Sequence, residues 1–438
     1  MGMQATAALG DAHAGAPSVS RAYAWSVFAL TFGLLLADYM SRQVLNAVFP
    51  LLKAEWLLTD TQLGSLSSVV AVMVGLLTFP LSLLADRWGR VRSLVLMAVL
   101  WSFATLGCAA SANYGQMFAA RFFVGVGEAA YGSVGLAVVL SVFPEHLRAT
   151  LSGSFLAGGS FGSMLGMALS GIVAAHFGWR WSFATMAVFG LVLAMIYRLV
   201  VTERRLAPER ALPARGAQRD ARPRFTPRGL ARALFASKAI GFAYVGCGVQ
   251  LILPGALFAW LPSYLVRGYA MRLDHASVLA AVFVLTSGLG MILCGVLTDR
   301  ISRRHAVRKW TMAVVYCAGA FAALATAFHL PPGPLQLVLI GAGMFLAPGV
   351  CGPTGALVAE LTPPALHATA MALWALANNL LGLAAGPLIA GMIADRMGLH
   401  MALQWIPFAA LGAALLFALG KRRYLDDPAR LAAPRREG

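Results

Sequence analysis

Charged residues are scarce in this chain of 438 residues. Asp, Glu, Lys and Arg together make up 12% of it, whereas hydrophobic residues make up 59%. A soluble domain usually carries about a quarter charged residues. Because so few charges could not cover this much apolar surface in water, the composition excludes soluble enzymes and soluble nucleic-acid-binding proteins.

Cysteine pairs and metal-ligand spacings are also missing. The five cysteines are an odd number, stand inside apolar runs and form neither a CxxC pair nor a cluster with histidine. We interpret them as small packed hydrophobic residues rather than as disulfides or metal ligands. Phosphate-binding Walker loops and nucleophile elbows are absent as well. We therefore expect no enzyme activity, no cofactor and no metal.

Long apolar segments are what the chain does contain. A membrane-spanning helix needs about 20 mostly apolar residues, and twelve segments meet this requirement. They lie at 24–50, 61–84, 93–111, 115–142, 150–175, 179–201, 237–267, 276–298, 309–330, 334–360, 366–394 and 401–420. The pattern predicts an all-α membrane protein with 12 transmembrane helices.

One long hydrophilic stretch, 202–236, divides these segments into two sets of six. It is rich in arginine and broken by prolines, which is typical of a flexible linker. We therefore predict two six-helix bundles, 22–201 and 237–421, joined by a cytoplasmic linker. Residues 1–21 lack the basic start and apolar core of a signal peptide, so we expect a disordered cytoplasmic tail there and a second cytoplasmic tail at 422–438.

Basic residues outnumber acidic ones, 34 against 17, and they stand between the apolar segments. They gather in the loops after the second and eighth segments and at the C-terminus, with Arg267 and Arg272 as exceptions on the opposite side. The positive-inside rule then predicts that both termini are cytoplasmic. Charge placed in this way indicates topology, and we expect no nucleic-acid partner. The compact loops favour a bacterial inner membrane.

The two halves resemble each other in sequence. The pair Asp86-Arg87 recurs as Asp299-Arg300, 213 residues further on, and the segment 144–150 recurs in similar form after 219 residues. Two matches at nearly the same offset predict two pseudo-symmetric bundles, related by an axis along the membrane normal. A substrate would then bind between the halves, near the middle of the membrane.

These motifs resemble those of the major facilitator superfamily, in the Asp-Arg-x-Gly-Arg loop, its second copy and the six-loop-six layout. Within it, residues 121–131 are similar to the Spinster-like lipid transporters and less closely to the anion:cation symporters, which carry organic anions. Residues 39–42 resemble the Tyr-x-Asp-Arg motif of both groups, although Ser41 stands where they usually have Asp. The resemblance implies that five loop residues act as gates: Asp86, Arg87, Arg90, Asp299 and Arg300.

Four ionisable residues lie well inside the apolar segments: Asp38, Arg42, Arg121 and Glu128. Each costs at least about 2.5–3.5 kcal/mol on the insertion scale, so such residues mark function by default. Helix geometry places Asp38 and Glu128 at the same depth, where Glu128 could exchange between the two arginines. We predict that Arg42 binds an anionic group and that Asp38, Glu128 and Arg121 serve proton coupling. Permanent structural ion pairs are the alternative.

The second half carries no such charge, because the position 219 residues after Glu128 is Ala347. It offers aromatic and amide side chains instead. The predicted substrate-binding residues are Arg42, Asn46, Tyr131, Trp260, Tyr264, Trp374, Asn378 and Asn379. One charged half and one apolar half suit an anion with an apolar or aromatic body, although ordinary packing explains any single one of the second-half residues equally well.

Together these features predict a secondary active transporter, monomeric and proton-coupled, that works by alternating access. Its partners would be the lipid bilayer, the proton and a small organic anion, either a carboxylate or an amphiphilic acid. Two alternatives stay open. The Spinster-like segment favours an exporter of lipids or lysolipids, and the missing Asp at Ser41 leaves room for a uniporter without proton coupling.

Overall fold

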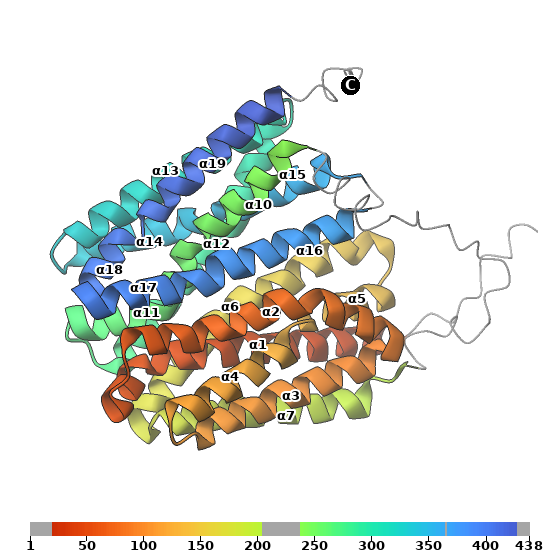
Figure 1. Cartoon of the computed structure of the whole chain (residues 1–438). Coiled ribbons are helices and arrows are strands. Elements are labelled where there is room, and N and C mark those ends of the chain that lie inside the picture. Colours follow the sequence, from red (N-terminus) through yellow and green to blue (C-terminus); the bar gives the residue numbers. More distant parts are fainter. Residues whose placement is uncertain (1–19, 204–236, 364–365, 427–438) are drawn as a thin grey trace, which may run out of the picture.

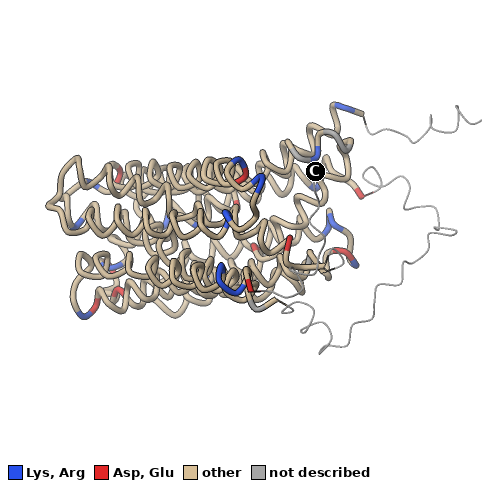
Figure 2. The backbone as a smooth tube through the Cα atoms, turned by 90° about the horizontal axis from the view of Figure 1, so that it is seen from above, with Lys and Arg blue, Asp and Glu red and all other residues tan. Residues whose placement is uncertain are grey.

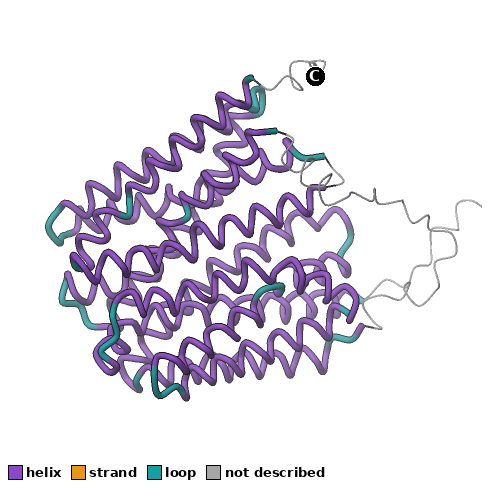
Figure 3. The backbone as a smooth tube through the Cα atoms, viewed as in Figure 1, coloured by secondary structure: helices purple, strands orange, loops and turns teal. Residues whose placement is uncertain are grey.

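A computed structural model describes residues 20–203, 237–363 and 366–426. The described residues form helices and short connections, with no strand among them (Figure 3). Residues 1–19 of the predicted N-terminal tail, nearly all of the predicted linker and the end of the C-terminal tail lie outside these residues, and the first helix begins at Arg21.

Twelve stretches in the described part of the chain are long and apolar enough to cross a membrane, which confirms the predicted fold class. The helices of the first half are α1 (Arg21–Trp56), α2 (Asp60–Trp88), α3 (Arg90–Ala110), α4 (Tyr114–Glu128), α5 (Tyr131–Val142), α6 (Glu145–Phe177) and α7 (Trp179–Val200). Those of the second half are α10 (Lys238–Gln250), α11 (Ile252–Gly268), α12 (Leu273–Ser302), α13 (Val307–His329), α14 (Pro334–Leu346), α15 (Cys351–Leu361), α16 (His367–Ala377), α17 (Ala385–Met397), α18 (Leu399–Trp405) and α19 (Phe408–Leu425).

Several spans are interrupted near their middle. The fourth span breaks between α4 and α5 directly after Glu128, and the tenth contains a 3₁₀ turn, Ala347–Val350, at the equivalent place in the second half. A break frees backbone groups that need other partners in a membrane. Thr78 donates to the carbonyl of Ala129 at 2.6 Å, and Gln250 donates to that of Ala347 at 3.3 Å. The internal repeat thus extends to the positions at which the helices break.

The eleventh span contains a π-helical segment, Asn378–Ala384, between α16 and α17. Such wider turns inside a helix occur mostly at functional sites. Pro387 follows in α17 and cannot donate a backbone hydrogen bond. The segment carries both asparagines that the sequence analysis selected for substrate binding, Asn378 and Asn379.

The two halves lie side by side and touch along their long axis (Figure 1). Across this boundary α6 packs on α12, α2 packs on α17, and α1 packs on α11. Glycine allows the close approach: a methyl group added to Gly64 would lie 2.4 Å from the carbonyl oxygen of Pro387, and one on Gly391 would lie 2.4 Å from that of Asp60. Most charged residues lie toward the ends of the helices (Figure 2), as the apolar middle of the bundle requires.

Candidate functional site

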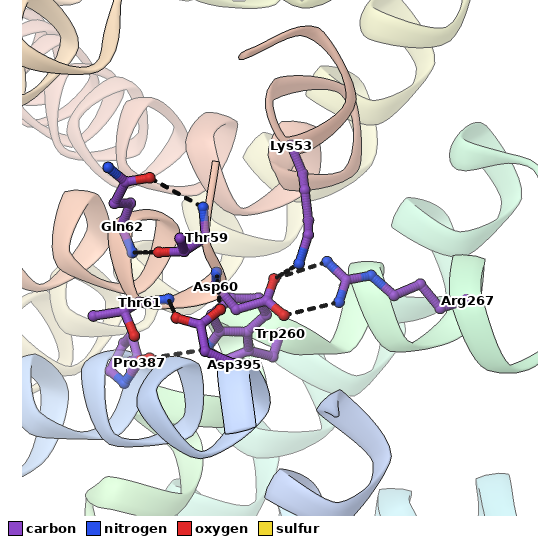
Figure 4. Close-up of polar contacts among 9 residues, drawn as sticks. All are labelled: Lys53, Thr59, Asp60, Thr61, Gln62, Trp260, Arg267, Pro387 and Asp395. Atoms are coloured by element: carbon purple, nitrogen blue, oxygen red, sulfur yellow. Dashed lines mark hydrogen bonds and ion pairs between the residues drawn. The ribbon is translucent and has the colours of Figure 1, made fainter. Parts of the chain in front are cut away.

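The halves are joined by polar contacts at one end of the bundle, which we call the closed end. It carries the connection between α1 and α2 and the C-terminus of α11, and lies opposite the end where α1 begins and α19 finishes, here called the terminal end (Figure 1). Four charged residues, Lys53, Asp60, Arg267 and Asp395, meet there (Figure 4). We call this group the closed-end cluster.

Asp60 is the centre of the closed-end cluster. Its buried carboxylate accepts from Lys53 Nζ of its own half at 2.6 Å. Arg267 of the other half binds both carboxylate oxygens, through Nη1 at 3.2 Å and Nη2 at 3.0 Å. Such two-point contacts fix geometry as well as charge. Arg267, an exception to the predicted charge asymmetry of the loops, therefore has a specific partner 207 residues earlier in the chain.

Asp395 makes a second connection between the halves. Its two carboxylate oxygens accept from the backbone N–H groups of Asp60, at 2.6 Å, and Thr61, at 2.9 Å. These N–H groups belong to the first turn of α2, where no helical partner exists and where the helix dipole favours a negative charge. Thr59 and Gln62 complete the cap through a reciprocal capping box. The start of α2 is thus held from both halves.

Trp260 lies next to this cluster and not along a cavity. Its indole N–H donates to the carbonyl of Pro387 at 2.9 Å, and its ring centre is 5.1 Å from that of Phe49 in the opposite half. The side chain is completely buried. In this conformation the indole packs the two halves together.

The intramembrane charges meet around Arg42. Its Nε lies 2.9 Å from Glu128 Oε2, and its Nη2 lies 3.5 Å from Asp38 Oδ2. Ser41 donates to the other oxygen of Glu128 at 3.0 Å. The carboxylates are buried, whereas the Arg42 side chain keeps 22% of its surface exposed. One guanidinium therefore joins carboxylates of two different helices and still faces an open space.

Arg121 is buried and contacts a backbone carbonyl in this conformation. Its Nε donates to the carbonyl of Leu66 at 3.3 Å, and Arg42 is the ion-pair partner of Glu128. Asp38 Oδ1 is buried and accepts no hydrogen bond within the described residues. The site thus holds two carboxylates and two guanidinium groups, with Arg121 bound to a neutral carbonyl.

A cavity of about 140 Å³ opens beside these charges, and we call it the polar chamber. Arg42 and Arg121 reach it from the first half and Asn379 from the π-helical segment of the second. Its wall consists of Tyr39, Arg42, Gln43, Asn46, Ser67, Val70, Ala71, Arg121, Ser163, Gly255, Phe258, Asn379, Leu383 and Pro387. Both halves therefore supply polar groups to one space between them.

A second cavity of about 240 Å³, the apolar chamber, adjoins the first. The two chambers share Tyr39, Ser163, Phe258 and Leu383 as lining residues. The remaining wall of the apolar chamber consists of Leu156, Gly159, Ser160, Leu251, Pro254, Val284, Ser287, Gly288, Met291, Pro348 and Cys351. This wall contains no charged side chain and no amide, in contrast to the polar chamber.

The structure separates the predicted substrate-binding residues into two groups. Arg42, Asn46 and Asn379 line the polar chamber. Tyr131, Tyr264, Trp374, Asn378 and Trp260 are absent from the walls of both chambers. The hydroxyl of Tyr131 donates to the carbonyl of Thr31 at 2.9 Å, and the ring of Tyr264 stacks on His400. Packing against other parts of the protein, which sequence spacing cannot reveal, keeps Tyr131 and Tyr264 from the two chambers.

Gln43, Ser67, Ser163 and Phe258 line the chambers although the sequence analysis did not select them. Gln43 accepts from Asn46 at 2.8 Å, and Ser67 donates to Asn46 at 3.1 Å. Neutral side chains of this kind carry no signal in a membrane helix, because they are common in ordinary packing. Of the closed-end cluster, only Arg267 was noted in the sequence, because it is a basic residue in a loop on the side where few basic residues occur.

The predicted gating loops lie at the terminal end. Asp86 pairs with Arg90 at 3.2 Å, within the first half. Asp299 and Arg300 are exposed at the end of α12. In the part of the chain that the structure describes, these residues form no contact across the halves comparable to the closed-end cluster. The halves are thus fastened at one end and not by these loops at the other.

Twelve membrane helices in two related halves, with a charged cavity between the halves, form the architecture of a membrane transporter. The sequence profile described as Major Facilitator Superfamily matches residues 31–352. The chain belongs to this superfamily.

Similar proteins fall into two groups, transporters named for organic acids and Spinster homologues. The chain is 27% identical to the probable L-galactonate transporter of Escherichia coli (strain K12), over 72% of this chain and 71% of that protein. It is 25% identical to the gallate transporter of Pseudomonas putida, over 93% of this chain and 94% of that protein. A solved bacterial homologue of the human lysosomal transporter Spinster, inward-facing and unoccupied, shares the fold with a TM-score of 0.82 at 19% identity, over 93% of this chain and 100% of that one.

Proposed function

We propose that this protein is a secondary active transporter that moves a small organic anion together with a proton, by alternating access. The observation that carries the proposal is the position of Arg42. Its guanidinium is partly exposed at the cavity wall while it holds the buried carboxylate of Glu128 at 2.9 Å. The named substrates of two relatives, L-galactonate and gallate, are organic acids, which supports an anion as the substrate.

Competition for Arg42 would couple the two fluxes. A substrate carboxylate that binds the guanidinium takes the place of Glu128, which would then be a buried charge without a partner. Such a charge costs several kcal/mol, and a proton on Glu128 removes the cost. Anion binding therefore favours protonation and protonation favours anion binding, so that the two move together. Cotransport of one monoanion with one proton carries no net charge across the membrane.

The departure at Ser41 from the usual family motif fits this scheme. Ser41 supplies a hydroxyl that donates to Glu128, and Asp38, one turn earlier on α1, supplies a second carboxylate to Arg42. The buried Oδ1 of Asp38 accepts no hydrogen bond among the described residues and is available for a proton. We assign Asp38 a supporting role in coupling, with Glu128 as the principal proton carrier.

The positive-inside distribution of charge places the terminal end in the cytoplasm. The closed end is then on the outside, and the conformation described above is inward-facing. The solved Spinster homologue with the same fold is also inward-facing. The closed-end cluster would be a latch that stabilises the inward-facing state. The loops around Asp86 and Asp299 would hold the halves together at the terminal end when the protein opens outward.

Uptake into proteoliposomes with and without an inward proton gradient tests the function. We expect the gradient to accelerate accumulation of an organic carboxylate, and uptake of gallate, benzoate and L-galactonate is measured side by side. The Spinster-like segment at 121–131 favours a lipid exporter as the second candidate, so lysophosphatidylcholine transport is measured in parallel. Transport of the lipid alone contradicts the anion proposal, and carboxylate transport that ignores the gradient identifies a uniporter.

The variant Asp60→Asn tests the latch. It removes the buried carboxylate that binds Lys53 and Arg267, whose side chains are 35% and 32% exposed. Hydrogen bonds to a charged group contribute about 1.5–3 kcal/mol. We expect the population to move strongly toward the state that is open at the closed end. Electron paramagnetic resonance between spin labels at Leu57 and Met397, which are both exposed, in a background without native cysteines, should report a longer distance.

Asp274→Asn is the matched control. Asp274 pairs with the exposed Arg272 in the same half, near the same end of the bundle. We expect no change in the distance between the two labels. If Asp60→Asn likewise leaves the distance unchanged, the closed-end cluster is not a latch.

A further inference from the structure

The two chambers differ in chemistry although they adjoin and share four lining residues. Eight side chains in the polar chamber carry an amide, hydroxyl or guanidinium group: Tyr39, Arg42, Gln43, Asn46, Ser67, Arg121, Ser163 and Asn379. The apolar chamber offers hydroxyl groups from Tyr39 and three serines and the thiol of Cys351, among apolar side chains and glycines. A ligand that occupies both chambers therefore needs one anionic pole and one body that can leave water.

We propose that the substrate is an aromatic or short branched monocarboxylate, whose carboxylate binds Arg42 and Arg121 while its ring or chain fills the apolar chamber. This inference rests on the proposed anion transport and specifies its substrate class. The charge of the arginines selects the acid, and the wall of the second chamber selects the apolar body. A polyhydroxylated sugar acid would bury hydroxyl groups there without enough partners, which costs free energy for each one.

Geometry supports the assignment of the two poles. Tyr39 stands at the junction of the chambers, with its ring centre 5.0 Å from the Arg42 guanidinium carbon. Phe258 of α11 lines the same junction from the other half. Two aromatic rings, one from each half, therefore belong to the wall that the chambers share. Flat apolar bodies pack well between such rings.

The size of the space limits the body. The chambers measure about 140 and 240 Å³, which together is near the lower end of the usual range for small-molecule sites, about 300–1,000 Å³. The apolar chamber lies at the crossing of α6 and α12, where a methyl group on Gly288 would lie 2.5 Å from Ser160 Oγ. A single ring or a short chain suits this space better than a long acyl chain.

A ligand panel on the purified full-length protein tests the proposal by thermal stabilisation, because a ligand that binds only the folded state raises the melting temperature. The probes are benzoate, benzyl alcohol, D-galactonate and lysophosphatidylcholine. We expect stabilisation by benzoate and none by the other three. Benzyl alcohol has the same ring without the charge, and D-galactonate has the same charge without the apolar body.

The outcomes separate the two proposals. Greater stabilisation by D-galactonate than by benzoate overturns the aromatic substrate class and leaves anion transport in place. Equal stabilisation by benzyl alcohol and benzoate overturns the anion site itself. Stabilisation by lysophosphatidylcholine alone identifies a lipid site, and stabilisation by none of the four contradicts the assigned class.

Variants of the apolar chamber give an independent measurement. The double variant Val284→Thr and Met291→Gln places polar groups on its wall while it nearly keeps the side-chain volumes. We expect benzoate affinity to fall about tenfold and the ratio of D-galactonate to benzoate affinity to rise. Val282→Thr, on the exposed face of the same helix, is the matched control and should behave as the wild type. An unchanged ratio in the double variant refutes the apolar subsite.

Discussion

Replacing Arg42 by alanine should lower carboxylate uptake about 100-fold. The substitution removes the group that faces the polar chamber and also leaves Asp38 and Glu128 buried without their cation. Removing one partner of a buried pair typically costs about 3–5 kcal/mol, and each 1.4 kcal/mol corresponds to about a factor of ten. Initial rates of gallate or benzoate uptake into proteoliposomes measure the effect.

Arg42→Lys separates charge from geometry. Lysine keeps the positive charge but lacks the planar fork that contacts two acceptors at once, whereas Arg42 joins the carboxylates of α1 and α4. We therefore expect Arg42→Lys to lose most transport. Arg272→Lys, at an exposed pair with Asp274, is the control and should transport normally. Normal uptake with unchanged KM in Arg42→Ala would exclude anion binding by this residue.

Glu128→Gln should abolish uptake driven by a proton gradient while counterflow exchange of substrate persists. Glutamine keeps the shape and the hydrogen bond with Ser41 but cannot carry a proton. Exchange needs only the movement of the loaded protein, whereas accumulation needs the proton. In the wild type, uptake should rise as the external pH falls, because protonated Glu128 leaves Arg42 free for the anion. This pH dependence should flatten in the variant.

Glu55→Gln is the control for Glu128→Gln. Glu55 binds Arg180 and Trp179 within the first half, at the closed end and away from the chambers. We expect its variant to keep gradient-driven uptake. If Glu128→Gln still accumulates substrate against its gradient, Asp38→Asn becomes the decisive variant. Unchanged coupling in both variants would favour a uniporter.

Sequence patterns were sufficient for the fold and for the level of the charged site. The apolar segments predict every span because a membrane helix must be apolar over its whole length. Asp38 and Glu128 are predicted to lie at one depth because each residue advances a helix by about 1.5 Å, and the structure places Arg42 within ion-pair distance of both. Both inferences use only local geometry along a single helix.

The sequence did not predict which side chains pair or pack with each other. Glu128 pairs with Arg42 although Arg121 lies on its own span, and Trp260 packs on Phe49 instead of facing the cavity. Which face of a helix meets which neighbour depends on the rotation and crossing of packed helices. A polar stripe predicts that a face is turned inward, but not what it touches.

Local composition and helical periodicity thus determined twelve spans, two halves and a charged level in the first half. Tertiary packing decided the two chambers and the closed-end cluster, in which Asp60 binds Arg267 from 207 residues away and receives its helix cap from Asp395, 335 residues away. The physical reason is range: hydrophobicity and helix geometry act over neighbouring residues, whereas an ion pair between halves forms only after the helices have packed.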